Sequence, residues 1–126
     1  MRNKEQAVNE IYKAIEEFGL VDILHRVFGK NIRIRLELTK SICETPIEEM
    51  TLSVRAYNAL KRAGIHTAGE LADWITENKL HTIRNLGVKS VRELQTKLMC
   101  LGYEHLTQQE KKEVVRKLIE NMEKEK

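Results

Sequence analysis

The sequence predicts a mainly α-helical fold, in which a compact four-helix module with tandem helix-hairpin-helix motifs is flanked by further helical segments. Three features indicate this fold. Apolar residues recur at helical spacing along most of the chain, and Gly or a capping Ser, Thr or Asn marks the ends of these stretches. A pattern typical of a helical hairpin also occurs twice near the centre. With 126 residues, the chain suits one domain of average size, or one small domain with helical additions.

The N-terminal segment predicts two amphipathic helices. The first runs from Asn3 to Phe18, with Asn3 as its cap and Gly19 as its stop, and the second runs from Leu20 to Phe28 and ends at Gly29. Their apolar positions fall on one side of each helix. They are Val8, Ile11, Tyr12, Ile15 and Phe18 in the first helix and Leu20, Ile23, Leu24, Val27 and Phe28 in the second.

The period then changes from that of a helix to that of a strand. Ile32, Ile34, Leu36 and Leu38 alternate with Arg33, Arg35, Glu37 and Thr39. No second strand is predicted to pair with this run. It is therefore either a strand completed by another chain, such as a second copy in a homodimer, or a helix or ordered linker.

The segment from Ser41 to Met50 contains the single proline of the sequence, Pro46, and forms the boundary before the central module. Four short helices are expected beyond it. Their approximate ranges are Ser53–Ala63, Thr67–Trp74, Thr76–His81 and Val88–Leu101, the last of them stopped by Gly102.

The two hairpins of this module form a sequence repeat. Each expected hairpin has an apolar residue, a Gly that turns the chain with positive φ, an apolar residue that fills the turn, and a Ser or Thr that caps the next helix. The capping boxes are expected from Thr67 with Glu70 and from Ser90 with Glu93. Leu60, Gly64, Ile65, Thr67, Glu70 and Leu71 correspond, 23 positions later, to Ile83, Gly87, Val88, Ser90, Glu93 and Leu94.

A last helix is expected from Thr107, which forms a capping box with Glu110. Its apolar stripe suits packing on the body of the protein or on a partner helix. The expected organisation is therefore an N-terminal extension over residues 1–44, a central domain over 45–103 and a C-terminal helix over 104–126. The stripe consists of Val115, Leu118, Ile119 and Met122.

Composition narrows the function classes. The formal net charge is only +3, so any basic face must be local. In the last helices of the module the basic residues Arg84, Lys89, Arg92 and Lys97 are accompanied by a single acid, Glu93. Cys43 and Cys100 lie far apart and outside any metal-ligand spacing, and the four histidines are scattered. We expect no enzyme activity, no metal and no cofactor, and a cytoplasmic protein without a membrane span.

The central segment strongly resembles the C-terminal domain of the bacterial RNA polymerase alpha subunit. The resemblance covers about residues 45–103, and its most specific pieces are LSVRAYNALKRAGI and RNLGVKS. It implies a compact four-helix module that binds the minor groove of A·T-rich double-stranded DNA and offers surfaces to activators and sigma factor. The implied setting is transcription at the nucleoid, with RNA polymerase as a partner.

The resemblance also assigns residues to these roles. The family's key arginine and asparagine fall on Arg55 and Asn58, one helical turn apart. A second DNA-binding cluster falls on Gly87, Lys89 and Ser90, with Glu93 as a weaker member. Glu48 and Glu49 match part of the family's acidic protein-contact surface, but Thr51 stands where an acid is often found.

Two functions remain open at this point. The first is a DNA-binding transcription module. The second is an adaptor that mimics the alpha domain and competes for its protein partners. Arg55 and Asn58 favour the first, because both residues match the family's DNA contacts. The apolar surface of residues 1–44 further suggests a homodimer that presents two DNA-binding modules.

Overall fold

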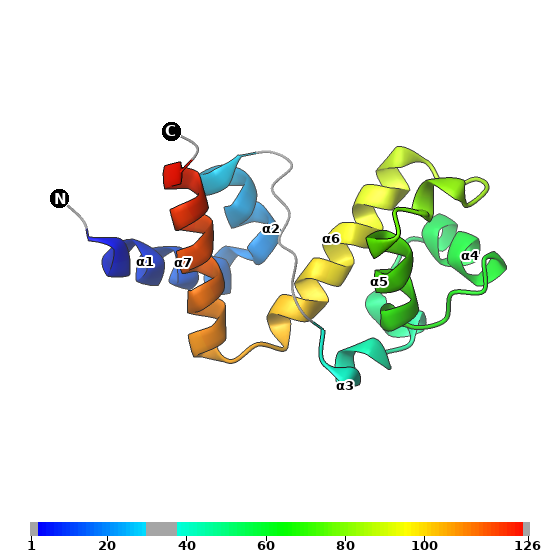
Figure 1. The fold of residues 1–126 in the computed structure, drawn as a ribbon, viewed down its shortest axis with the longest axis horizontal. Coiled ribbons are helices and arrows are strands. Elements are labelled where there is room, and N and C mark those ends of the chain that lie inside the picture. Colours follow the sequence, from blue (N-terminus) through cyan, green and yellow to red (C-terminus); the bar gives the residue numbers. More distant parts are fainter. Residues whose placement is uncertain (1–2, 30–37, 125–126) are drawn as a thin grey trace. The chain divides into compact units, whose positions relative to one another are not determined.

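Figure 1 shows the fold in a computed structural model, which describes residues 3–29 and 38–124. The protein divides into two units, one comprising residues 35–105 and the other residues 1–34 with 106–126. Each is mainly α-helical, as predicted. Within the described residues, β structure is limited to one isolated antiparallel bridge between Pro46 and Thr67. The alternating run 32–38 lies outside the described residues except for Leu38, and no described helix is long and apolar enough to cross a membrane.

The unit of residues 35–105 contains the predicted central module. Its core is formed by apolar side chains of all its main helices, including Ile47, Leu60, Ile65, Leu71 and Leu94, each fully buried. The elements, in sequence order, are α3 (Lys40–Cys43), the 3-10 turn η2 (Ile47–Met50), α4 (Val54–Arg62), α5 (Ala68–Thr76), the 3-10 turn η3 (Leu80–Thr82) and α6 (Val88–Glu104).

The first hairpin, from α4 to α5, follows its prediction. Gly64 has φ of 80°, which an L side chain adopts only with strain, and Ile65 is fully buried behind the turn. Thr67 caps α5, because its Oγ1 accepts from the backbone N–H of Glu70 at 3.2 Å. The Glu70 carboxylate accepts from the N–H of His66 at 3.1 Å, one residue before the N-cap, so the second half of the expected capping box is shifted by one residue. These bonds satisfy donors that α5 itself cannot.

The second hairpin differs from its prediction. Gly87 has φ of −77° and is itself the N-cap of α6, so Ser90 lies inside the helix and makes no cap with Glu93. The residue with positive φ is Asn85, at 66°. Leu86 fills the turn at 7% exposure, whereas Val88 is 71% exposed. The predicted register was wrong because Asn, like Gly, tolerates the left-handed conformation, and the turn is therefore made two residues before Gly87.

Two helix boundaries also differ from their predictions. α6 does not stop at Gly102 but continues to Glu104, and Tyr103 in this extension is 3% exposed. The brief helix expected at Thr76–His81 is instead the 3-10 turn η3, because α5 runs to Thr76 and the backbone then turns through Asn78 with φ of 56°.

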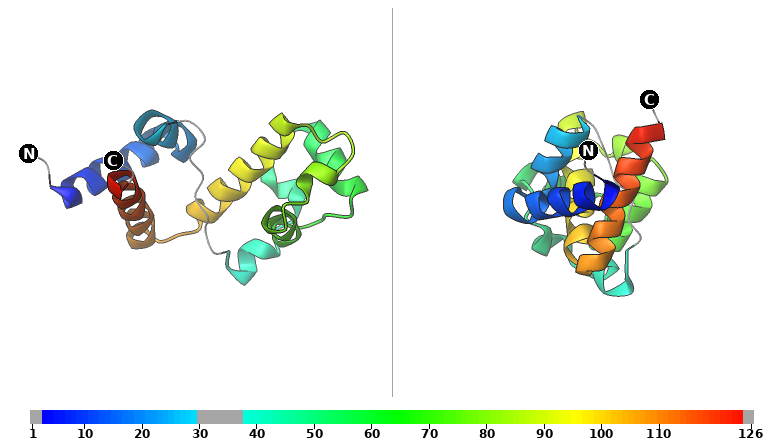
Figure 2. Two further views of the ribbon diagram at one scale, coloured as in Figure 1. Left: turned by 45° about the horizontal axis from the view of Figure 1, so that its top comes forward. Right: turned by 90° about the vertical axis from the view of Figure 1, so that its left-hand side faces the viewer.

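The other unit pairs the two ends of the protein. It consists of α1 (Lys4–Phe18), α2 (Leu20–Ile23), the π-helix η1 (Leu24–Phe28) and α7 (Gln108–Lys124). α1 and α7 cross and are in contact with each other (Figures 1 and 2). The predicted caps are confirmed: Asn3 forms a capping box with Gln6, Gly19 ends α1, and Thr107 forms a capping box with Glu110.

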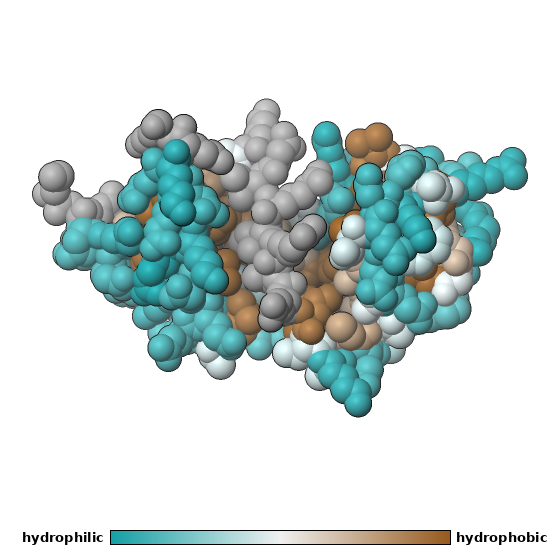
Figure 3. All heavy atoms as spheres, in the orientation of Figure 1, coloured by the Kyte–Doolittle hydropathy of each residue, from teal (hydrophilic) through white to brown (hydrophobic). Residues whose placement is uncertain are grey.

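Apolar and charged contacts hold α1 and α7 together. Val8 and Val115 are fully buried, and the Arg116 guanidinium bonds both carboxylate oxygens of Glu5 at 3.0 Å. These bonds hold the pKa of the Glu5 carboxyl below its usual range. The outward side of α7 is hydrophilic (Figure 3). In the predicted apolar stripe of the C-terminal helix, Val115 and Ile119 are therefore buried where α7 packs on α1 of the same molecule, whereas Met122 stays 37% exposed.

The side chain of Glu93 links the two hairpins of the central unit. The Glu93 carboxylate on α6 accepts from the backbone N–H of Ser53 and from its hydroxyl, both at 2.9 Å. Ser53 is the N-cap of α4, where its Oγ accepts from the N–H of Ala56 at 3.2 Å. Glu93 thus supplies, from 40 residues further along the sequence, the acidic half of a capping arrangement for α4.

We predict that Glu93→Ala lowers the free energy of unfolding of this unit by about 1–2 kcal/mol, because it removes a charged acceptor from a helix N-terminus. Urea unfolding followed by the fluorescence of Trp74, the single tryptophan of the sequence, measures this unit. Glu104→Ala, which removes an exposed acid from the same helix, is the matched control. Equal stability of the two variants would contradict the assigned role of Glu93.

Candidate nucleic-acid interface

The N-terminal ends of α4 and α6 meet on one side of the central unit. The contact between Glu93 and Ser53 joins them, and a second contact lies beside it: the Arg55 Nε donates to the backbone carbonyl of Asn85 at 3.3 Å. Residues that the sequence analysis assigned to two separate clusters are therefore brought together. We call the set Arg55, Asn58, Gly87, Lys89 and Ser90 the helix-start surface.

Arg55 is the second residue of α4 and is exposed. The bond to Asn85 uses only its Nε, and the two terminal nitrogens of the guanidinium make no bond with any described residue. Asn58 follows one turn later on α4 and is also exposed. The side chain of Arg55 is therefore restrained at its base while its charged end faces solvent.

The start of α6 adds backbone donors to this surface. Gly87 is the N-cap, the helix has no hydrogen-bonded side-chain cap, and nothing lies within 4 Å of where a Gly87 Cβ would stand. The first N–H groups of a 17-residue helix are thus accessible at the positive end of its dipole. Lys89 is exposed and Ser90 is half-buried in this first turn. Such a helix start can bind a phosphate group.

The acidic residues assigned to protein contacts lie on a different element, η2. Glu48 accepts from the Tyr57 hydroxyl at 3.2 Å and pairs with the Lys61 ammonium at 3.3 Å. The bond from its own backbone N–H, together with these partners, lowers the pKa of the Glu48 carboxyl. Glu49 is exposed and its side chain forms no bond with a described residue. Of these two acids, only Glu49 therefore has a carboxylate that forms no hydrogen bond or ion pair with a described residue.

Two functional features were missed at the level of sequence. The carbonyl of Asn85 restrains Arg55, and Ser53 receives Glu93. The signal for Asn85 was its place before Leu86-Gly87, because Asn is the side chain that most often replaces Gly in a left-handed turn. For Ser53 no local signal exists, since its partner is far along the sequence. Within the described ranges, no three His, Cys, Asp or Glu side chains group closely enough to hold a metal ion.

Comparison with known proteins places this sequence in a family. The family model for the C-terminal domain of the bacterial RNA polymerase alpha subunit matches residues 36–99, just over half of the sequence. No solved structure gives a significant match.

Curated relatives match the same region. The protein is similar to "DNA-directed RNA polymerase subunit alpha" of Rubrobacter xylanophilus, with 55% identity over 60 residues, or 48% of this protein and 19% of the relative. It is also similar to the subunit of Carboxydothermus hydrogenoformans, with 44% identity over 84 residues, or 65% of this protein and 26% of the relative. For the subunit of Frankia alni the identity is 58% over 57 residues, which is 45% of this protein and 16% of the relative.

The match thus spans between 16% and 26% of the length of these three relatives. The matched residues include both hairpins and the whole helix-start surface. Because the family model covers more than half of the sequence, the protein belongs to the family of C-terminal domains of bacterial RNA polymerase alpha subunits.

Proposed function

We propose that the central unit binds double-stranded DNA through the helix-start surface, with a preference for the minor groove of A·T-rich sequences. The observation that carries this proposal is the restrained Arg55 guanidinium beside the uncapped start of α6. A narrow A·T minor groove has an enhanced negative potential, which attracts an inserted arginine. Asn58 lies one turn from Arg55 and supplies a hydrogen-bonding group to the same groove.

Phosphate contacts then hold the module on the duplex. The N–H groups at the start of α6, the Lys89 ammonium and the Ser90 hydroxyl all suit phosphate oxygens. We assign Glu93 a positioning role in this surface, because its carboxylate is already bonded to Ser53. Through that bond Glu93 keeps the starts of α4 and α6 adjacent, so that one duplex can contact both.

The biological setting that we propose is transcription in the bacterial cytoplasm, at the nucleoid. The curated relatives are RNA polymerase alpha subunits, which supports an association of this protein with RNA polymerase. We further propose sigma factor or activators as partners, because the family resemblance implies surfaces for them. Glu48 and Glu49 are the candidate protein-contact residues, and Glu49 has the unengaged carboxylate. In this proposal the protein acts by binding and carries out no catalysis.

Arg55→Ala tests the groove contact. We expect it to weaken binding to an A·T-rich duplex by about 1–3 kcal/mol without unfolding the unit, because one groove contact is lost. Fluorescence anisotropy with a labelled duplex measures the affinity. Lys79→Ala removes an exposed positive charge elsewhere on the same unit and serves as the control. Unchanged affinity in a folded Arg55→Ala variant would rule out the minor-groove assignment.

Lys89→Ala tests the phosphate contact. Its affinity should fall about equally on A·T-rich and G·C-rich duplexes, and the slope of log affinity against log salt should decrease by roughly one. Titrations of both duplexes at several salt concentrations give both quantities. A variant that lost its preference for A·T-rich DNA but kept the wild-type slope would show that Lys89 contacts bases instead.

We also propose that the protein forms a homodimer through its N-terminal segment. Val8 and Ile15 on α1 are buried, but Phe18, Val21 and Val27 stay 55%, 44% and 41% exposed. Burying such side chains against a second copy removes apolar surface from water. Sedimentation equilibrium should show dimers for the wild type and monomers for Phe18→Asp. A wild-type protein that is monomeric at tens of micromolar would refute the dimer.

A further inference from the structure

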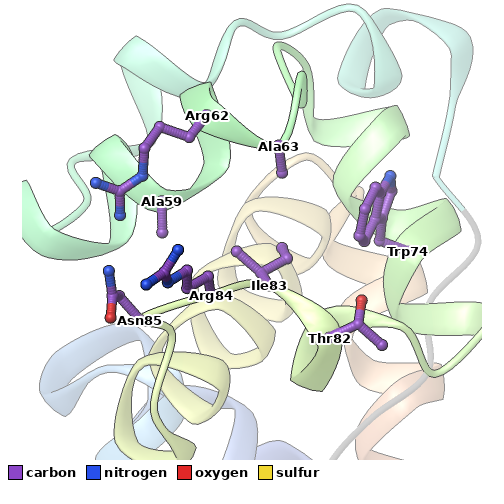
Figure 4. Close-up of a pocket in the computed structure, with 8 residues that line it drawn as sticks. All are labelled: Ala59, Arg62, Ala63, Trp74, Thr82, Ile83, Arg84 and Asn85. Atoms are coloured by element: carbon purple, nitrogen blue, oxygen red, sulfur yellow. The ribbon is translucent and has the colours of Figure 1, made fainter.

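A pocket of about 500 Å³ lies in the central unit between α4, α5 and the loop that precedes α6 (Figure 4). Its inner wall is apolar, because Ala59 is fully buried there and Ile83 is 8% exposed. The half-buried indole of Trp74 forms one end of the pocket in Figure 4, and two arginines, Arg62 and Arg84, lie toward the other end. The remaining lining residues are Ala63, Thr82 and Asn85.

The positive charge of this pocket is not neutralised by the described part of the protein. Arg62 and Arg84 are both exposed, and neither forms an ion pair or hydrogen bond through its side chain with a described residue. None of the lining residues is acidic. The charge balance therefore favours an anionic ligand, and arginine is the side chain best suited to bind a carboxylate through two parallel hydrogen bonds.

We propose that this pocket docks an acidic segment of a protein partner, in which Asp or Glu residues flank one Phe or Leu. The apolar side chain would cover Ala59, Ile83 and the Trp74 indole, and the carboxylates would pair with Arg62 and Arg84. A peptide matches both halves of the pocket. A DNA backbone would satisfy the two arginines through its phosphates but would leave the apolar wall in contact with water.

The proposal is independent of DNA binding, although the two surfaces adjoin. Asn85 lines the pocket, and its backbone carbonyl accepts the bond from Arg55. The pocket residues Arg62, Trp74 and Arg84 are outside the helix-start surface. A failure of either proposal therefore leaves the other in place.

The test uses Trp74 as its reporter, since the sequence has no other tryptophan. A short synthetic peptide with one Phe between Glu and Asp residues is titrated into the full 126-residue protein. Tryptophan emission and the anisotropy of a labelled peptide are both followed. We expect saturable binding that weakens with salt. A peptide with Phe→Ala, and one with its acids changed to amides, should each bind about tenfold more weakly or worse, which corresponds to about 1.4 kcal/mol.

Variants of the protein locate the site. The double variant Arg62→Gln/Arg84→Gln should bind the acidic peptide at least about tenfold more weakly. Lys61→Gln/Lys79→Gln removes the same formal charge from two lysines of this unit that do not line the pocket and that pair with Glu48 and Glu77, and it should bind as the wild type does. Both pairs are exposed, so the fold should persist, and circular dichroism checks this. The same affinity in the arginine variant overturns the proposal, as does the absence of peptide binding to the wild type.

The same variants are also titrated with an A·T-rich duplex, which tests DNA as the alternative ligand of the pocket. If an A·T-rich duplex changes Trp74 emission, and the arginine variant loses affinity for duplex but not for peptide, the pocket belongs to the DNA surface and the proposal is wrong. If Arg55→Ala weakens duplex binding and leaves peptide binding unchanged, the two sites are separate, as we propose.

Discussion

The contact between Glu93 and Ser53 is the interaction on which the functional side of the central unit depends. A carboxylate placed at a helix N-terminus is stabilised by unpaired N–H groups and by the helix dipole. Here the carboxylate belongs to another helix, so this local stabilisation also fixes the distance between α4 and α6. The Arg55 to Asn85 bond needs the same alignment, because its donor and acceptor lie in different hairpins. One capping interaction thereby organises residues from both halves of the repeat.

Local chemistry predicted much of the fold. The caps at Asn3, Thr67 and Thr107 and the stop at Gly19 could be found from the sequence, because each depends on side chains within four residues. The register of the second hairpin could not be found in this way. The sequence repeat pairs Gly64 with Gly87, but the backbone pairs Gly64 with Asn85, since these two have positive φ. The spacing of Ser90 and Glu93 predicts a local capping box. The actual partner of Glu93 is Ser53, which lies 40 residues away and cannot be identified from the local sequence.

Periodicity predicts which face of a helix is apolar, but not what covers it. The apolar face of α1 could have been completed by a second copy or within the same molecule, and the structure pairs much of it with α7. For the candidate site, too, the sequence predicts which residues take part but not what they contact. The resemblance identified Arg55 and Lys89, whereas the restraint on Arg55 and the pocket near Trp74 depend on segments that meet only in the folded unit.

The long span between Ser53 and Glu93 has a consequence for the order in which this unit is completed. Contacts between distant residues form late, because the intervening residues must first be ordered. During synthesis the whole of α4 and α5 is made before Glu93 has been added. The first hairpin can close on its own local caps, but the start of α4 has no acidic partner until α6 follows. A nascent polypeptide therefore carries Arg55 long before that arginine is aligned for use.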